Sequence, residues 1–403
     1  MAENNKKIFC QNLWKIFGSN PESAFHLIKN GESKQEFMEE TGNVIAIRDA
    51  SFDVKENEVF VIMGLSGSGK STLVRCINRL IEPTRGSVFI EGTDIAQMNK
   101  HDLKELRRHK LSMVFQNFGL LPHRSVLENV AFGLEVRGEG QNTIHKKSFE
   151  ALEMVGLKGW ERSQIFELSG GMQQRVGLAR ALAVGSEILL MDEPFSALDP
   201  LIRRQMQEEF VNLHSKLERT VVFITHDLIE ALRLGDRIAI MRDGQIVQLG
   251  TSQEIVSSPA DDYVREFVKD VPRGKVIECQ SIMEKPSAVI PSDQPVTNAI
   301  EEMKKKDTGL GFVVDTSGVL KGTLTMDQAL ATARKGSTKA GEIASREFPA
   351  TPPNTQLDQC LQLVAEDDIP VAVTDEKHHL LGVITRPLVL KAVQSDVSVS
   401  AEA

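Results

Sequence analysis

The sequence predicts an α/β protein: a parallel sheet covered by helices, followed by a second, internally repeated α/β region. A glycine-rich stretch, Gly64–Ser71, lies between an apolar run at 59–63 and a helical pattern at 72–77. Two more unbroken apolar runs, at 188–191 and 221–224, are separated by helical patterns. Such runs are typical of parallel strands buried on both faces.

The remaining elements follow from local patterns. Strands are expected at 8–17, 44–54, 87–91 and 111–115. Helical spacing is expected at 20–42, 101–110 and over most of 125–185. Residues 237–249 predict a hairpin with Asp243-Gly244 as its turn.

Composition narrows the class of protein. With 403 residues, 41% hydrophobic and 26% charged, the chain is expected to be globular, with two or three domains. A net charge of −9 argues against nucleic acid as a partner. No apolar run approaches the roughly 18 residues of a membrane span, and the N-terminus lacks a signal peptide's apolar region. Cys10, Cys76, Cys279 and Cys360 stand far apart and predict reduced cytosolic thiols.

The glycine-rich stretch fits G-x-x-x-x-G-K-[ST] at every fixed position. Glycines let several backbone N–H groups point at phosphate oxygens, and the helix that follows adds its positive end. Lys70 would reach the β- and γ-phosphates, and the Ser71 hydroxyl would ligate Mg²⁺. The stretch therefore predicts binding of a nucleoside triphosphate by Gly64, Ser66, Gly67, Ser68, Gly69, Lys70, Ser71 and Thr72.

Polar residues end both of the other apolar runs. Asp192 and Glu193 follow the first, and His226 comes just after the second. Open α/β sheets bind ligands at the carboxyl ends of their strands. We expect Asp192 to hold Mg²⁺, Glu193 to polarise the attacking water and His226 to contact the γ-phosphate. The alternative is a purely structural role, in which Asp192 and Glu193 cap a turn and His226 serves the packing.

Further motifs resemble those of ATP-binding-cassette (ABC) ATPases. Leu168–Arg175 (LSGGMQQR) resembles the signature motif of that family and stands in the family's order along the chain. Gln116 matches the Q-loop, Ser196–Asp199 the D-loop and His226 the switch histidine. The resemblance implies a P-loop cassette with a helical signature subdomain, and places Gln116 among the catalytic and Mg²⁺-binding residues.

The resemblance also implies a head-to-tail homodimer with two ATP molecules between the subunits. Ser169, Gly170, Gly171 and Asp199 would then approach the nucleotide held by the partner's phosphate loop. An aromatic residue stacks on adenine in this family, just before a glycine that matches Gly18. Phe17 has that register and is favoured, while Trp14 is the competing candidate.

Within the family, the match narrows to the ATPase subunits of glycine betaine/proline betaine importers. The segment 20–42 and motifs at 81–86, 114–118, 175–182 and 195–203 are similar to those subunits. The resemblance implies ATP-driven import of a quaternary amine osmoprotectant, with an integral-membrane permease and a substrate-binding protein or domain as partners. Residues 116–128 would receive the permease, at the cytoplasmic face of the bacterial plasma membrane. An importer of choline or carnitine, or a non-transport cassette ATPase, is the alternative.

The C-terminal region contains a repeat. Asp315, Gly322 and Thr325 recur 60 residues later as Asp375, Gly382 and Thr385. The repeat resembles a tandem pair of CBS domains. We therefore divide the chain into an ATP-binding domain (1–272), two CBS domains (273–336 and 337–395) and a disordered tail (396–403).

The CBS pair departs from its family's nucleotide-binding pattern. In that pattern a Thr or Ser is followed three residues later by an Asp that holds the ribose. Thr325 is followed at this spacing by Gln328, and Thr385 by Leu388. Binding of an adenosine nucleotide is therefore not favoured here. The importers are associated with sensing of ionic strength, but the direction in which the pair would act is left open.

Overall fold

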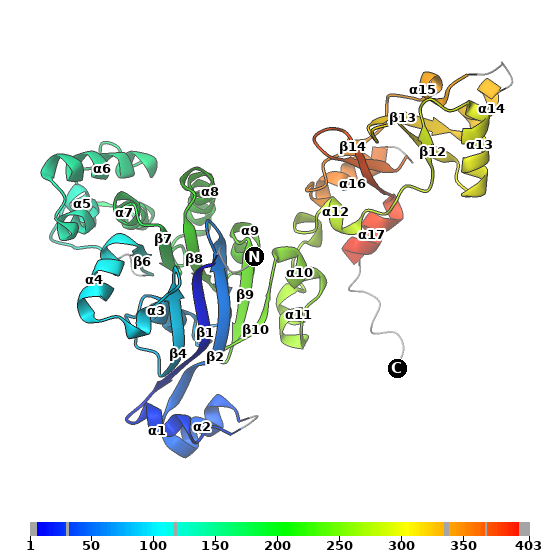
Figure 1. Cartoon of the computed structure of the whole chain (residues 1–403). Coiled ribbons are helices and arrows are strands. Elements are labelled where there is room, and N and C mark those ends of the chain that lie inside the picture. The colour runs from blue at the N-terminus through cyan, green and yellow to red at the C-terminus, as the bar shows by residue number, and fades with distance from the viewer. Residues whose placement is uncertain (1–5, 30–31, 117–118, 334–337, 367–368, 395–403) are drawn as a thin grey trace. The chain divides into compact units, whose positions relative to one another are not determined.

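The computed structural model describes residues 6–29, 32–116, 119–333, 338–366 and 369–394 (Figure 1). It divides into two compact units, one up to Val268 and one from Lys269. Asn117 and Phe118, which belong to one of the motifs above, and the predicted disordered tail at 396–403 lie outside the described residues. Among the described helices, none is long and apolar enough to cross a membrane.

The first unit is built on a six-stranded sheet in the order β10-β9-β3-β8-β7-β6. Every residue of β3, β7 and β8 is buried, and these strands pair in parallel, as the unbroken apolar runs predicted. The predicted hairpin forms the antiparallel edge, with Asp243 and Gly244 both at positive φ (51° and 83°). The strands are β3 (Val59–Met63), β6 (Leu111–Val114), β7 (Ile188–Asp192), β8 (Thr220–Thr225), β9 (Arg237–Arg242) and β10 (Gln245–Gly250).

A second, antiparallel sheet shares a core with the first, and helix α3 (Lys70–Ile77) lies in that core. The strand order of the second sheet is β2-β1-β4-β5. The helix buries Leu73, Val74, Cys76 and Ile77 in this core, which also contains side chains of both sheets. Two layers therefore hold the helix that begins at the phosphate loop. The strands are β1 (Lys6–Phe17), β2 (Val44–Lys55), β4 (Arg85–Ile90) and β5 (Thr93–Asp94).

Helices make up most of the rest of this unit. Helices α5, α6 and α7 pack against one another as a helical group at one side of the parallel sheet (Figure 1). Ser125 begins α5 with a capping box, and Ser169 caps α7. The helices are α4 (Lys100–His109), α5 (Val126–Arg137), α6 (Gln141–Met154), α7 (Gly170–Ala183), α8 (Pro200–Leu217), α9 (Leu228–Leu234), α10 (Ser252–Ser257) and α11 (Asp262–Val268), with 3₁₀ turns at Ile95–Gln97 and Ile165–Glu167.

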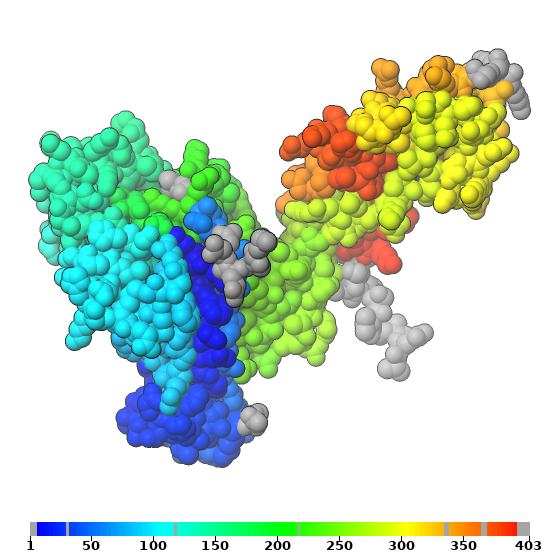
Figure 2. All heavy atoms as spheres, in the orientation of Figure 1, coloured from blue at the N-terminus to red at the C-terminus, as the bar shows by residue number. Residues whose placement is uncertain are grey.

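The inserted segment between β1 and β2 forms two short helices where the sequence predicted continuous helical spacing. These are α1 (Pro21–Phe25) and α2 (Lys34–Thr41). The break has a local cause, because Ser33 and Glu36 form a capping box that starts a new helix. Phe37 anchors α2 in a small core with Ile16, Ala24 and Ile45. In Figure 2 the segment forms a lobe of its own on the first unit (blue).

The second unit contains two three-stranded sheets of the same design. In each, a short first strand pairs in parallel with the second, which pairs antiparallel with the third. The sequence reading missed both first strands. The first set is β11 (Val289–Pro291), α13 (Val296–Lys305), β12 (Leu310–Val314), β13 (Leu320–Thr325) and α14 (Met326–Ala333); the second is β14 (Ala350–Thr351), α16 (Leu357–Glu366), β15 (Val371–Thr374), β16 (Leu380–Ile384) and α17 (Arg386–Gln394). Short helices α12 (Cys279–Ile282) and α15 (Ala340–Ile343) and a 3₁₀ turn (Arg273–Lys275) complete the unit.

The two repeats exchange backbone hydrogen bonds. Glu284, from the segment before β11, pairs with Val383 of β16, and Ser345, from the segment before β14, pairs with Thr323 of β13. Gly322 and Gly382 permit this approach. A Cβ at Gly322 would lie 2.4 Å from the Ser345 carbonyl oxygen, and one at Gly382 would lie 2.8 Å from Met283 Sδ. The recurring glycine therefore marks the places where the repeats interlock.

A cluster of ion pairs ties the two sheets of the first unit together near the first residues of β1, β6 and β7. Lys7 of β1 is almost buried and pairs with Glu91 and Glu187. Lys110 pairs with Glu187 as well. Hydrogen bonds from Lys110 and then Lys7 lower the pKa of Glu187 to about 2.

We predict that Glu187→Gln destabilises the protein by about 1 kcal/mol or less at pH 7, since the side chain is 46% exposed and solvent screens its pairs. The carboxylate's pKa is lowered from 4.5, so its stabilisation is complete above that value and fades as pH falls toward about 2. Urea unfolding should show the difference from wild type narrowing between about pH 5 and pH 3. Glu56→Gln, 4.0 Å from Lys7, is the control. A pH-independent difference would contradict the prediction.

Candidate functional site

The phosphate loop connects β3 to α3 and has the backbone that only glycines tolerate. Gly64, Gly67 and Gly69 have φ values of 152°, 78° and 103°. A Cβ at Gly64 would lie 2.2 Å from the Met241 carbonyl oxygen, and one at Gly69 would lie 2.2 Å from the Ala46 carbonyl oxygen. Conformation and space therefore both exclude larger residues at Gly64 and Gly69, and at Gly67 the positive φ alone favours glycine.

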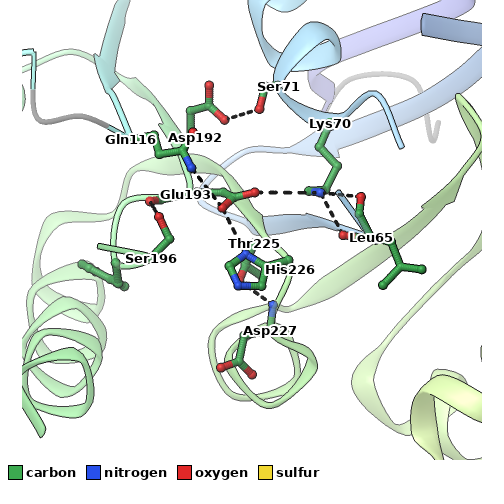
Figure 3. A network of polar contacts seen from close by, with 12 residues as sticks. Leu65, Lys70, Ser71, Gln116, Asp192, Glu193, Ser196, Thr225, His226 and Asp227 are labelled. Atoms are coloured by element: carbon green, nitrogen blue, oxygen red, sulfur yellow. Dashed lines mark hydrogen bonds and ion pairs between the residues drawn. The ribbon is translucent and has the colours of Figure 1, made fainter. Parts of the chain in front are cut away.

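Lys70 turns back over this loop. Its Nζ donates to the carbonyl oxygens of Gly64 (2.8 Å) and Leu65 (3.0 Å), and lies 3.9 Å from Glu193 Oε1 (Figure 3). The side chain is only 4% exposed, and burial lowers the pKa of Lys70. The loop therefore holds a nearly desolvated cation at its centre.

Asp192 ends β7 and faces the start of α3. Its Oδ1 accepts a hydrogen bond from Ser71 Oγ (2.8 Å), and its Oδ2 accepts one from Arg75 (3.1 Å). The carboxylate is fully buried. Ser71 and Arg75 are four residues apart, on one face of α3. That spacing could have identified Arg75, which the sequence reading missed.

Glu193 is held in a strained conformation beside His226. Its φ is 47°, uncommon for a residue with a side chain, and such strain concentrates at functional sites. Its Oε2 lies 3.0 Å from His226 Nδ1 and 3.4 Å from Gln116 Nε2 (Figure 3). With the proton on Nδ1, His226 donates to this carboxylate. These contacts aim Glu193 toward Lys70.

One cavity of 670 Å³ is bordered by Lys70, Ser71, Gln116, Glu193 and His226, whereas Asp192 lies behind Ser71 and does not line it. It is open enough to admit a nucleotide-sized ligand, and polar and cationic groups converge on it. Its lining is formed by Phe17, Lys34, Val44, Ile45, Ala46, Leu65, Ser66, Gly67, Gly69, Lys70, Ser71, Thr72, Gln116, Glu193 and His226.

Comparison with known proteins assigns the family. The ABC transporter family model matches residues 47–196, and the CBS domain model matches 279–333 and 340–395. The glycine betaine transport ATP-binding protein OpuAA of Bacillus subtilis is 46% identical over 387 residues, which cover 96% of this chain and 92% of OpuAA. The chain belongs to the ABC transporter ATPases that carry a C-terminal CBS pair.

Three further comparisons agree with this family. The glycine betaine/proline betaine transport system ATP-binding protein ProV of Escherichia coli is 46% identical over 97% of this chain and 98% of ProV. A dimeric bacterial ABC transporter cassette of known structure superposes with a TM-score of 0.52 at 32% identity, covering 61% of this chain and 98% of that one. A relative named for glycine betaine, carnitine and choline transport, OpuCA of B. subtilis, is 34% identical.

The signature and D-loop residues of this ABC ATPase lie outside the cavity. Ser169 caps α7, Asp199 caps α8, and both residues are exposed, as is Gly170. A Cβ at Gly171 would lie 2.7 Å from Ile202 Cγ2, so close packing against α8 requires glycine there. The structure therefore gathers Lys70, Ser71, Asp192, Glu193, Gln116 and His226 but leaves the signature residues on a separate surface.

The two adenine candidates differ in their surroundings. Phe17 is 40% exposed and lines the cavity. Trp14 does not line the cavity and packs edge-to-face on Phe25, with ring centroids 5.2 Å apart. The Trp14 ring is thus held by contact with the inserted segment, whereas the Phe17 ring is available to contact a ligand in the cavity. Lys34 was not anticipated from the sequence, because no motif marks a single lysine in an insertion.

We predict that Phe17→Ala weakens ATP binding about fivefold, the loss of roughly 1 kcal/mol of stacking. Trp14→Ala should leave the affinity within about twofold, because its ring packs on the inserted segment instead. Equilibrium binding of a fluorescent ATP analogue distinguishes them. A larger loss in Trp14→Ala than in Phe17→Ala would reverse the assignment.

Proposed function

We propose that this chain hydrolyses ATP to drive import of glycine betaine or a related quaternary amine through a separate integral-membrane permease. The observation that best supports hydrolysis is the Glu193 carboxylate, which His226 and Gln116 hold toward Lys70 across the cavity. Full-length similarity to glycine betaine transport ATP-binding proteins supports the substrate class.

The residues would act together on ATP. Phe17 would stack on adenine, while backbone N–H groups of Gly64–Ser71 would bind the phosphates with the α3 N-terminus. Lys70 would exchange its two carbonyl partners for β- and γ-phosphate oxygens. Glu193 would orient a water for in-line attack on the γ-phosphorus, so that the bond to the β,γ-bridging oxygen breaks and ADP leaves. His226 would steady Glu193 and contact the γ-phosphate.

Ser71, Asp192 and Gln116 fit a Mg²⁺ ion. The Ser71 hydroxyl and the Asp192 carboxylate already meet at the start of α3, and both are oxygen donors. Within the described residues no group of three or more His, Cys, Asp or Glu could hold a metal by itself. Mg²⁺ commonly takes one or two protein oxygens and completes its shell with phosphates and water. It would neutralise charge on the β- and γ-phosphates.

The exposed signature surface supports a head-to-tail homodimer. Ser169, Gly170 and Gly171 open α7, where backbone N–H groups and the helix dipole favour an anion. None of them lines the cavity of their own chain, so a second copy would have to supply them. Asp199, at the start of α8, would lie at the same interface.

The transport partners follow from the same proposal. Residues 116–128 would receive the permease at the cytoplasmic face of the bacterial membrane, and a substrate-binding protein or domain would deliver the amine outside. Choline or carnitine is the second candidate substrate, supported by the more distant OpuCA relative. The CBS pair would regulate the cassette, and we keep the domain limits 1–272, 273–336 and 337–395 as part of this proposal.

The CBS pair is poorly equipped for an adenosine nucleotide. Gln328 stands where a ribose-binding carboxylate would be needed, and it caps α14 instead: its Oε1 accepts from the Thr325 N–H at 3.0 Å. The Gln328 N–H donates in return to Thr325 Oγ1 at 3.3 Å. This arrangement favours regulation by a signal other than a nucleotide.

We predict that Glu193→Gln lowers ATP turnover at least about 100-fold, because the amide cannot accept a proton or polarise water as the carboxylate does. ATP affinity should stay within a fewfold, since Lys70 and the loop are intact. Lys70→Ala, in contrast, should lose ATP binding itself. Phosphate release and equilibrium binding measure the two effects, and near-normal turnover in Glu193→Gln would refute its assignment.

Transport itself is testable by reconstitution in vesicles with the cognate permease and binding protein. ATP-driven uptake of labelled glycine betaine is expected, and the Glu193→Gln chain should support none. Uptake that rises with internal salt would support regulation by ionic strength. Intact ATPase activity without uptake of any quaternary amine would contradict the proposed transport function.

A further inference from the structure

The inserted segment brings a second lysine to the nucleotide cavity. Lys34 is the first residue of α2 and lines the cavity together with Ser66, Gly67 and Lys70. Its Nζ lies 3.5 Å from the Gly67 carbonyl oxygen, at the outer limit of a hydrogen bond. The contact spans 33 residues of sequence and connects the insertion directly to the phosphate loop.

The insertion is fixed in place by contacts that do not involve Lys34. Phe37, one turn further along α2, is fully buried against β1 and β2 residues. Arg48 of β2 donates to the carbonyl oxygen of Glu32 at 2.6 Å. Arg48 N–H also donates to the carbonyl oxygen of Gly244, at the turn beside the phosphate loop. The position of Lys34 therefore results from packing on both sides of it.

The polar contacts of the Lys34 ammonium are weak. Among the residues that the structure describes, no carboxylate forms an ion pair with it, and its one hydrogen-bond acceptor is a carbonyl oxygen at long range. Burial lowers the pKa of Lys34, with only a partial opposing effect from Asp243. A half-buried cation that forms no close ion pair with a described carboxylate gains from an anion that enters the cavity.

The start of α2 is not itself an anion site. The Ser33 side chain accepts from the Glu36 N–H, and the Glu36 carboxylate accepts from the Ser33 N–H at 2.8 Å. These caps already satisfy the N–H groups that would otherwise face a ligand. The side chain of Lys34 is therefore the feature that points to a ligand.

We propose that Lys34 is a further nucleotide-binding residue, whose ammonium leaves the Gly67 carbonyl oxygen and pairs with a non-bridging oxygen of the bound triphosphate. This inference rests on the proposed function, because it requires ATP in the cavity. It gives the insertion a role: α2 extends over the phosphate loop and adds a positive charge that Lys70 alone does not supply. Lys34 contributes to binding and takes no part in the attack on the γ-phosphorus.

The test compares Lys34→Gln and Lys34→Arg with Lys29→Gln in the full-length chain. Lys29 is the matched control, since it lies in the same insertion, pairs with Glu40 at the surface and does not line the cavity. Lys34→Gln should raise the KM and Kd for ATP about five- to tenfold with a much smaller change in kcat, which is the pattern of lost ground-state binding. Lys34→Arg should retain most of the affinity.

A salt titration separates a charge contact from a structural effect. The difference in Kd between wild type and Lys34→Gln should shrink as ionic strength rises, because salt screens a partly exposed pair. Equal losses in Lys34→Gln, Lys34→Arg and Lys29→Gln, or a difference that salt does not change, would overturn the inference. So would an unchanged Kd in Lys34→Gln while Lys70→Ala abolishes binding. Failure of the wild type to bind ATP would instead overturn the proposed function.

Discussion

The order of strands in the parallel sheet is the constraint on which the site depends. β3, β8, β7 and β6 are consecutive neighbours, and each has a functional residue or loop at or just after its carboxyl end. The phosphate loop follows β3, and His226 follows β8. Asp192 is the last residue of β7 and Glu193 is the next one, while Gln116 comes two residues after β6. Parallel pairing puts all four carboxyl ends at one edge, so residues distant in sequence converge there.

Packing next to this edge holds the site residues in fixed positions. Helix α3 starts at the loop and buries four side chains in a core shared by both sheets, so it cannot shift without disturbing that core. Glu193 shows the cost of the arrangement: its φ of 47° is held by its own N–H bond to Ile224 and by the Ser196 hydroxyl on its carbonyl oxygen. Strain of about 1–3 kcal/mol persists only where surrounding contacts enforce it.

Sequence reasoning identified the residues that end buried strands, because apolar runs and glycine spacing are local signals. It could not give the distance between Glu193 and His226, which depends on the strand order. Lys34 and Arg75 were missed for different reasons. Arg75 required only helical spacing from Ser71, whereas Lys34 reaches the cavity through the fold of a 26-residue excursion between Phe17 and Val44. Strands β11 and β14 are too short to show any alternation.

The glycine that occurs at the same place in both repeats has a structural role. Gly322 and Gly382 have no positive φ, so the backbone angles alone do not require glycine. Each is needed because a segment of the other repeat occupies the space that a Cβ would require. Cys279, which precedes the first sheet, likewise lies in a core with Cys360 and Val371 of the second repeat. Since each repeat completes the other's packing, neither is expected to fold alone, and the two repeats form one compact unit.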